Sequence, residues 1–155
     1  MRMSRCRLTR EIYMTRALMK AFPDTAMVFD KAIQGGCSKR RPDVLMDLLT
    51  HVLIVECDEK QHKPKSYIAQ CERRRKMELF RDVGSRPVVF VRFNPDGYNG
   101  VGGCFRDDVD KNGERVLTVL PEWRVRVKEL VRVVGEHMVN IPKREVTETR
   151  LFFDS

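Results

Sequence analysis

Residues 41–62 read RPDVLMDLLTHVLIVECDEKQH, and this stretch decides how we interpret the rest of the chain. Pro42 and Asp43 open a first strand that runs roughly to Leu48. The continuous apolar run Val52–Val55 fits a second strand that is buried on both faces. A short turn joins the two strands, so we expect a hairpin whose second strand runs directly into carboxylates.

These carboxylates need a partner of opposite charge or access to water, because an unpaired charge in a protein core is costly in free energy. Side chains alternate along a strand, so Glu56 and Asp58, and Lys60 if the strand continues, are expected to point the same way. Together with Asp43, these two acidic residues supply the hard oxygen ligands that Mg²⁺ prefers. We therefore expect a magnesium site at the end of the hairpin, with open positions for water and phosphate.

The chain has 155 residues and a formal net charge of +8, and it is expected to form one domain. The positive charge favours a polyanionic partner, nucleic acid first and an acidic membrane surface second. No apolar run approaches the roughly 20 residues of a membrane span, and we see no secretory signal, so we expect no membrane segment. The five scattered cysteines form no close CxxC pair, which favours reduced thiols in a cytoplasmic or nuclear compartment.

Basic residues surround the hairpin in the sequence. Lys39, Arg40 and Arg41 belong to a Gly-containing loop that either grips a phosphate or is a plain connection, and the two interpretations fit equally well. Any one of these charges is most simply explained as solvated surface. As a group they suit a phosphodiester held beside a metal, so we take as candidate DNA contacts these three residues together with Lys63, Lys65, Arg73 and Arg74.

Helices are expected over residues 10–22, 66–83 and 121–139. Thr9 can cap the first helix, and Glu11 in its first turn is either a charge that suits the helix dipole or a residue at the edge of the metal site.

The middle helix is expected to end at Gly84, because glycine readily follows the last residue of a helix. Glu72 and Arg75 are three residues apart and can pair on its surface.

The remaining segments read as strands and one long loop. Residues 26–29 and 87–93 form strand candidates, and residues 116–120 form a weaker one. Residues 98–112 are rich in Gly and Asp without periodicity and are expected to form a long loop. The tail, residues 146–154, is strand-like and is expected to dock onto the domain.

This order of elements predicts an α/β fold with a small mixed sheet flanked by helices. We expect a single domain over residues 1–155, with its core in about residues 9–93. The helix and tail of residues 121–154 would pack on that core.

The PD at residues 42–43 and the ExD at residues 56–58 resemble the motif of the PD-(D/E)xK nuclease superfamily. The segment ECDEKQH, the helix with Glu72 and Arg75, and the strand PVVFVRF look closest to the branch that includes very-short-patch repair endonucleases. The similarity covers about residues 11–93. It implies a restriction-endonuclease-like core, and in that branch an E/V-x-D-x-x-x-H pattern tends to replace the usual lysine.

Two registers of the motif stay open. Read literally, the DEK at residues 58–60 is the D-x-K. By similarity with the repair-endonuclease branch, Glu56 and Asp58 are the acidic pair, and Gln61 or His62 takes the place of the lysine. We favour Glu56 as a metal ligand because it follows the apolar strand directly.

The resemblance implies a Mg²⁺-dependent deoxyribonuclease in which Mn²⁺ substitutes for Mg²⁺. Asp43 and Glu56 would hold the metal, with Asp58 belonging to the site in either register. One of Lys60, Gln61 and His62 would position the attacking water. Secondary roles fall to Glu11, Glu72 and Arg75.

Two other classes of function compete with this hypothesis. One is a DNA-binding module that keeps the fold but has lost the chemistry. The other is an interaction protein whose acidic hairpin is ion-paired to its own arginines. The DNA would be duplex or structured. A homodimer fits double-strand cleavage and a monomer fits nicking, so the oligomeric state stays open.

Overall fold

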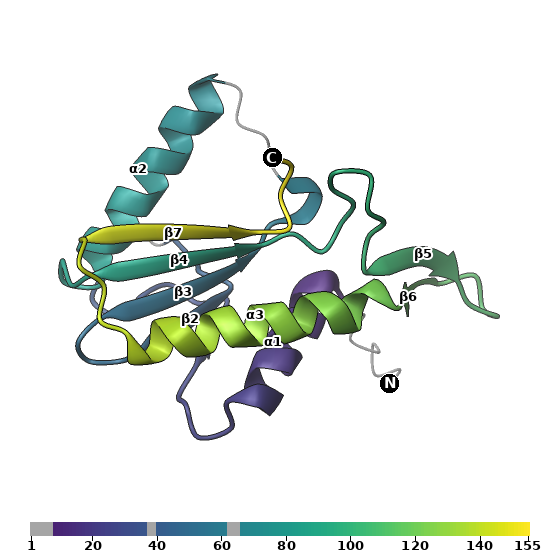
Figure 1. The fold of residues 1–155 in the computed structure, drawn as a ribbon, viewed down its shortest axis with the longest axis horizontal. Helices are drawn as coiled ribbons and strands as arrows, with labels where there is room; N and C mark the ends of the chain where they lie inside the picture. Colours follow the sequence, from purple (N-terminus) through teal and green to yellow (C-terminus); the bar gives the residue numbers. More distant parts are fainter. Residues whose placement is uncertain (1–7, 37–39, 62–65) are drawn as a thin grey trace, which may run out of the picture.

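The computed structural model describes residues 8–36, 40–61 and 66–155, and within them the protein is mixed α/β (Figure 1). In chain order the elements are α1 (Arg10–Ala21), β1 (Val28–Phe29), β2 (Val44–Asp47), β3 (Val52–Cys57), the 3₁₀ turn η1 (Glu59–Gln61), α2 (Ser66–Asp82), β4 (Val88–Phe93), β5 (Phe105–Val109), β6 (Arg115–Val119), α3 (Glu122–Val139) and β7 (Val146–Leu151).

Five strands form one mixed sheet in the order β1-β2-β3-β4-β7. The β1–β2 and β2–β3 pairs are antiparallel, and β3–β4 and β4–β7 are parallel. All six residues of β4, and all but the last of β3, are buried. A central strand that is covered on both faces has no solvent side, which explains their continuous apolar sequences. The predicted small mixed sheet is confirmed.

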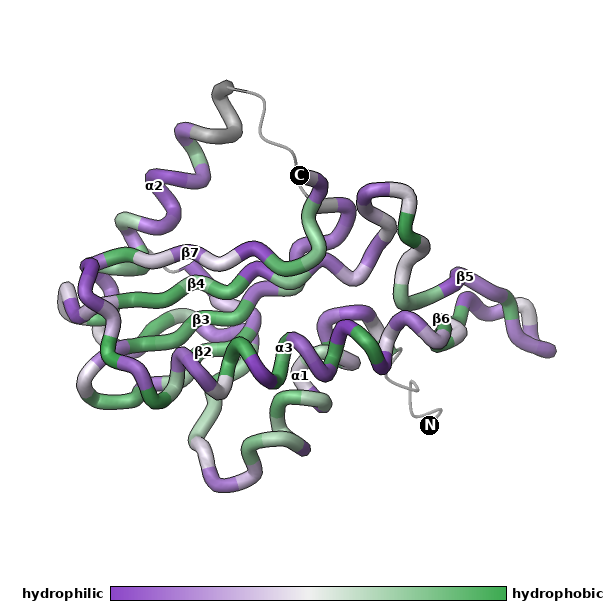
Figure 2. Tube along the Cα trace, viewed as in Figure 1, coloured by the Kyte–Doolittle hydropathy of each residue, from purple (hydrophilic) through white to green (hydrophobic). Residues whose placement is uncertain are grey.

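Helices cover both faces of this sheet. α1 and α3 lie on one face and α2 lies on the other (Figure 1). On the first face Leu18 and Leu130 share a hydrophobic cluster with Val55, and on the second Leu79 packs with Ile54. Because side chains alternate along β3, one strand supplies both clusters. Figure 2 shows β3 and β4 as the most continuously hydrophobic part of the sheet.

The helix ends follow local sequence rules. The Thr9 side chain accepts a 3.2 Å hydrogen bond from the Ile12 N–H and caps α1, as predicted. Gly84, at φ +78°, ends α2 in a conformation that favours glycine, and its N–H donates to the Arg81 carbonyl at 3.0 Å. Pro121 directly precedes α3 instead of starting it.

The predicted long loop over residues 98–112 is wrong in its second half. Phe105–Val109 pairs with Arg115–Val119 in an antiparallel hairpin that projects from the body (Figure 1). At its tip, the Asp110 carboxylate accepts the Asn112 and Glu114 N–H groups at 2.8 and 2.9 Å. Such Asx turns allow a tight reversal within a charged segment.

The strand-like tail forms β7 and pairs with β4 over six residues, from Val146 opposite Val88 to Leu151 opposite Phe93. It is therefore a member of the five-stranded sheet. No helix within the described part of the chain is both long and apolar enough to span a bilayer.

Candidate functional site

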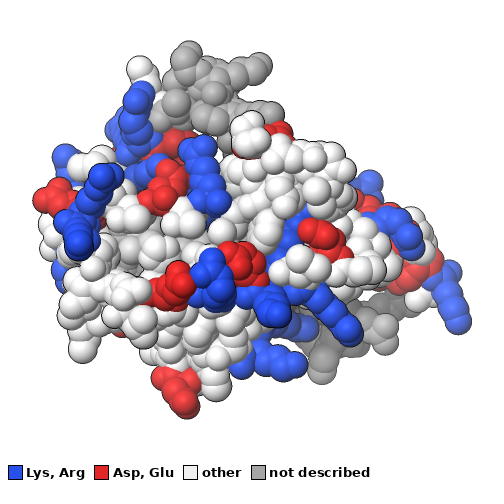
Figure 3. All heavy atoms as spheres, viewed as in Figure 1, with Lys and Arg blue, Asp and Glu red and all other residues white. Residues whose placement is uncertain are grey.

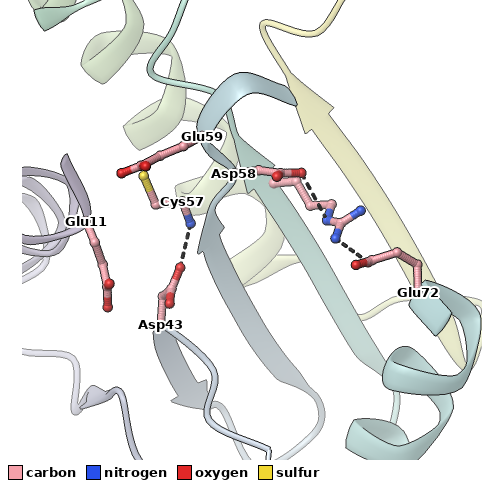
Figure 4. A pocket seen from close by; sticks show the side chains of 7 residues that line it. Glu11, Asp43, Cys57, Asp58, Glu59 and Glu72 are labelled. Atoms are coloured by element: carbon pink, nitrogen blue, oxygen red, sulfur yellow. Dashed lines mark hydrogen bonds and ion pairs between the residues drawn. The ribbon is translucent and has the colours of Figure 1, made fainter. Parts of the chain in front are cut away.

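Asp43 and Glu56 lie opposite each other where the β2–β3 ladder ends. The register pairs Val44 with Val55, so the next residues outward are Asp43 and Glu56. Directly opposed residues of an antiparallel pair project to the same face. The Asp43 carboxylate also accepts a 2.8 Å hydrogen bond from the Cys57 N–H, which fixes its orientation (Figure 4).

Burial makes both carboxylates difficult to ionise. It raises the pKa of Asp43 to about 6, and the neighbouring Glu11 carboxylate adds to the rise. Burial likewise raises the pKa of Glu56 to about 7, with the charge of Asp43 acting in the same direction and the Arg75 guanidinium opposing it. A cation placed between them would favour the charged form of both.

The cavity beside this pair has a volume of about 420 Å³. It opens between α1, the end of the β2–β3 ladder, η1 and α2, and its wall is formed by Glu11, Asp43, Cys57, Asp58, Glu59, Glu72 and Arg92 (Figure 4). Glu56 is buried beside Asp43 instead of being exposed in this wall. Glu11 from α1 thus reaches the site edge, and burial raises its pKa.

Asp58 turns away from Asp43 toward Arg92 on β4 (Figure 4). The Arg92 guanidinium lies 3.6 Å from Asp58 and 3.4 Å from Glu148 on β7, and it is hydrogen-bonded to Glu72 on α2. Arg92 is 8% exposed, so these contacts are shielded from water. The acidic residues of the hairpin are therefore divided between an open group around Asp43 and a neutralised group around Arg92.

Arg75 forms a second link between α2 and the sheet, because its guanidinium donates to the Glu56 carboxylate. Lys76 donates in the same way to Glu148. We predicted that Glu72 and Arg75 pair with each other on the helix surface, and this is wrong: both turn inward and contact residues of the sheet. Each has a partner of opposite charge that is shielded from water, Arg92 for Glu72 and Glu56 for Arg75, and the Coulomb energy of an ion pair grows as solvent is excluded.

Lys60 was expected to point the same way as Glu56 and Asp58 only if the strand continued that far, and it does not. β3 ends at Cys57, and Lys60 lies in η1 with φ at +58°. Its side chain is exposed, and its N–H donates to the Asp96 carboxylate at 2.6 Å. The alternation of a strand therefore places neither Asp58 nor Lys60. Gln61 ends the turn, and His62 lies outside the described residues.

Some of the candidate DNA contacts bind other groups of the protein, one is exposed, and the others lie outside the described residues. Arg40 and Arg74 both donate to Glu78, at 2.8 and 3.0 Å, and Arg41 donates to the Asp30 carbonyl at 2.7 Å. Arg73 is exposed on α2. Lys39, Lys63 and Lys65 lie outside the described residues.

Within the described residues, no three acidic, cysteine or histidine side chains form a group that could hold a metal ion. The donor chemistry nevertheless suits a hard divalent cation, because Asp43 and Glu56 are adjacent carboxylates with raised pKa values. Glu11 lies on the same cavity wall and is close enough to Asp43 for its charge to raise the pKa of that carboxylate.

Sequence reasoning missed Glu59 and Arg92 as residues of the cavity wall. Arg92 carried a usable signal, since it is a lone charge inside the apolar run PVVFVRF, and a buried charge needs partners. Glu59 carried none, because its position depends on where β3 ends.

Comparisons of the chain with protein-family models, with curated proteins and with solved structures found no match.

Proposed function

We propose that this protein is a metal-dependent deoxyribonuclease with a restriction-endonuclease-like core, whose centre is formed by Asp43 and Glu56. One observation carries the proposal. The half-buried Asp43, directly before β2, and the buried Glu56 of β3 are opposed in register, and the pKa of each is raised beside an open cavity. Such tuning of neighbouring acids is typical of functional sites.

Asp43 and Glu56 would hold Mg²⁺ or Mn²⁺, and Glu11 would add an oxygen ligand at the cavity edge. When bound, the cation would polarise a phosphate oxygen and lower the pKa of a bound water. Arg75 contacts Glu56, so its guanidinium is the group best placed to supply the positive charge that a lysine contributes in the usual motif. Arg92 keeps Asp58 and Glu72 neutralised on the cavity wall.

The substrate class follows from charge. The chain carries a net charge of +8, and Arg73 is exposed on α2 close in sequence to the cavity residue Glu72. On the face shown in Figure 3, acidic and basic side chains are interspersed, so the positive excess is not gathered there into one patch. We infer non-specific contacts to a DNA backbone, in a cytoplasmic or nuclear compartment.

The test is nicking of supercoiled plasmid with MgCl₂ and with EDTA. Asp43→Asn and Glu56→Gln are expected to abolish nicking and to leave DNA affinity, measured by fluorescence anisotropy, nearly unchanged. Glu129→Gln, an exposed carboxylate on α3, serves as the matched control and should cleave normally. Full activity of either site variant in MgCl₂ would reject this centre.

A DNA-binding module without chemistry is the second candidate. It is favoured by the ion pairs of Glu56 with Arg75 and of Asp58 with Arg92, which neutralise these acids without a metal. In that case binding would be equal in MgCl₂ and EDTA, and neither Mg²⁺ nor Mn²⁺ would support cleavage. DNA affinity that is weak and nearly independent of salt would instead favour the interaction protein.

A further inference from the structure

Asp96 joins two walls of the cavity although it lies far from them in the sequence. It belongs to the turn that follows β4. One carboxylate oxygen accepts the Lys60 N–H of η1 at 2.6 Å, and the other forms an ion pair with the Arg10 Nε of α1 at 3.2 Å. The Asp96 side chain is 23% exposed, so water only partly competes with these contacts.

The backbone that carries Asp96 is itself fixed by a buried cation. Arg126 on α3 is 0% exposed and donates to the carbonyls of Asn94, Asp96 and Gly102 at 2.9, 2.6 and 2.6 Å. The Asp96 N–H also donates to the Asn94 side chain at 2.9 Å. The carboxylate is therefore presented from a rigid turn.

Both partners of Asp96 are adjacent in sequence to acids of the cavity wall. Arg10 precedes Glu11 in the first turn of α1, and Lys60 follows Glu59 in η1. A single carboxylate thus links the two segments that carry Glu11 and Glu59. Lys60 holds a φ of +58°, a conformation that a non-glycine residue adopts only when its surroundings enforce it.

We infer that Asp96 is a positioning residue of this site, which bridges α1 to η1 and so fixes the spacing of the acidic walls. Its consequence for cleavage rests on the proposed function, whereas its structural role does not. The residue touches neither substrate nor cation in this role.

Amide hydrogen exchange by NMR tests the bridge directly. Asp96→Ala is expected to speed exchange of the Lys60 amide about tenfold or more, and to shift the Glu11 and Glu59 amide resonances. Asp107→Ala is the matched control, because Asp107 also contacts Arg10, at 3.2 Å, but it is 79% exposed and the Lys60 N–H donates to Asp96 instead. It should leave the Lys60 and Glu59 amides unchanged.

Asp96→Asn provides a conservative variant that stays informative if the alanine variant does not fold. The amide oxygen can still accept the Lys60 N–H, while the ion pair with Arg10 is lost. We expect normal Lys60 exchange and a shifted Glu11 amide. Unchanged Lys60 exchange in Asp96→Ala, an unshifted Glu11 amide in Asp96→Asn, or the same Lys60 loss in the Asp107 control overturns the inference.

Cleavage kinetics extend the test to catalysis. Asp96→Ala should lower kcat by about 10- to 100-fold with KM for DNA within about twofold, since a small misplacement of catalytic groups slows the chemical step. Asp96→Asn should retain more activity than Asp96→Ala. Normal kcat in a variant that has lost Lys60 protection overturns the inference. If the wild type does not cleave DNA, the proposed function fails, and the amide measurements alone decide the role of Asp96.

Discussion

At Glu56, burial and an ion pair act on one carboxylate in opposite directions. Burial raises its pKa, the Arg75 guanidinium opposes the rise, and the result is a pKa of about 7. The Glu56 carboxylate is therefore harder to ionise than an exposed glutamate, and a nearby positive charge favours its ionised form.

This raised pKa predicts a pH-dependent stability. The folded protein binds the Glu56 proton more tightly than the unfolded chain does, because the pKa of Glu56 is near 4.5 in the unfolded chain and about 7 in the folded protein. The resulting stabilisation is complete below pH 4.5 and is lost as the pH rises through about 7. The loss is on the order of 3 kcal/mol. Urea denaturation across this range should show it, and Glu56→Gln should reduce it to the part that Asp43 contributes through its own raised pKa.

Glu136→Gln is the control, since Glu136 is an exposed carboxylate on α3. It should retain the pH dependence of the wild type. Saturating MgCl₂ should weaken that dependence in the wild type, because a bound cation favours the charged carboxylates. An unfolding free energy that rises between pH 4.5 and 7 would contradict the raised pKa of Glu56.

Some of the residues of the candidate site could be predicted from the sequence. Asp43 and Glu56 could be selected because a charged motif flanks an apolar strand. Arg92 and Asp96 could not be assigned their roles, because the partners of Arg92 lie 20 to 56 residues away and those of Asp96, Lys60 and Arg10, lie 36 and 86 residues away. Contacts of that separation exist only once the sheet has formed.

At the scale of elements, α2 docks on the sheet in two different ways along its length. Its C-terminal half packs Leu79 and Phe80 against the sheet, together with Val83 just after the helix. Closer to its N-terminus, Arg75 and Lys76 are held by ion pairs. Ion pairs are strong only where their geometry is precise and water is excluded. The docking of this part of the helix on the sheet therefore depends on Arg92 staying shielded from water.

Arg92→Met is therefore expected to destabilise the protein by about 3 kcal/mol, because it leaves buried carboxylates without their shared cation. Arg132→Met is the matched control, since Arg132 also contacts two carboxylates, Glu129 and Glu136, but is 54% exposed. It should lower the unfolding free energy far less than Arg92→Met does, because exposed ion pairs contribute little. Equal effects of the two variants in urea denaturation would contradict shielding at Arg92.

The three helices and strands β3 and β4 were predictable because their patterns are long and strongly periodic. The β5–β6 hairpin was not, because Asp107 and Asp108 interrupt the apolar alternation, and its pairing depends on the Asx turn at Asp110. β1 has only two residues, Val28 and Phe29, and both lie within the strand candidate expected over residues 26–29.

At the scale of the whole molecule, β7, the last strand in chain order, forms one edge of the five-stranded sheet. β7 covers the β4 edge that faces away from β3, and Glu148 brings a carboxylate to Lys76 and Arg92. The sequence placed the core within residues 9–93, but the five-stranded sheet includes this strand from outside that range.

Truncation after Asn140 should therefore abolish cooperative unfolding. It removes β7, exposes the apolar edge of β4 and leaves Arg92 and Lys76 without Glu148. Circular dichroism melts of the truncated and full-length chains measure this. A truncated chain that melts cooperatively near the full-length Tm would show that β7 is dispensable.

The order in which the strands enter the sheet has a consequence during synthesis on the ribosome. The β2–β3 hairpin is local and can close as soon as residue 57 has emerged, whereas β4 finds its outer neighbour only after Leu151. The nascent chain thus carries a bare, strongly apolar strand edge for much of its elongation, which invites association with other chains. We expect chaperone contact to matter most in this window, after the acidic hairpin exists but before Glu148 arrives to share Arg92.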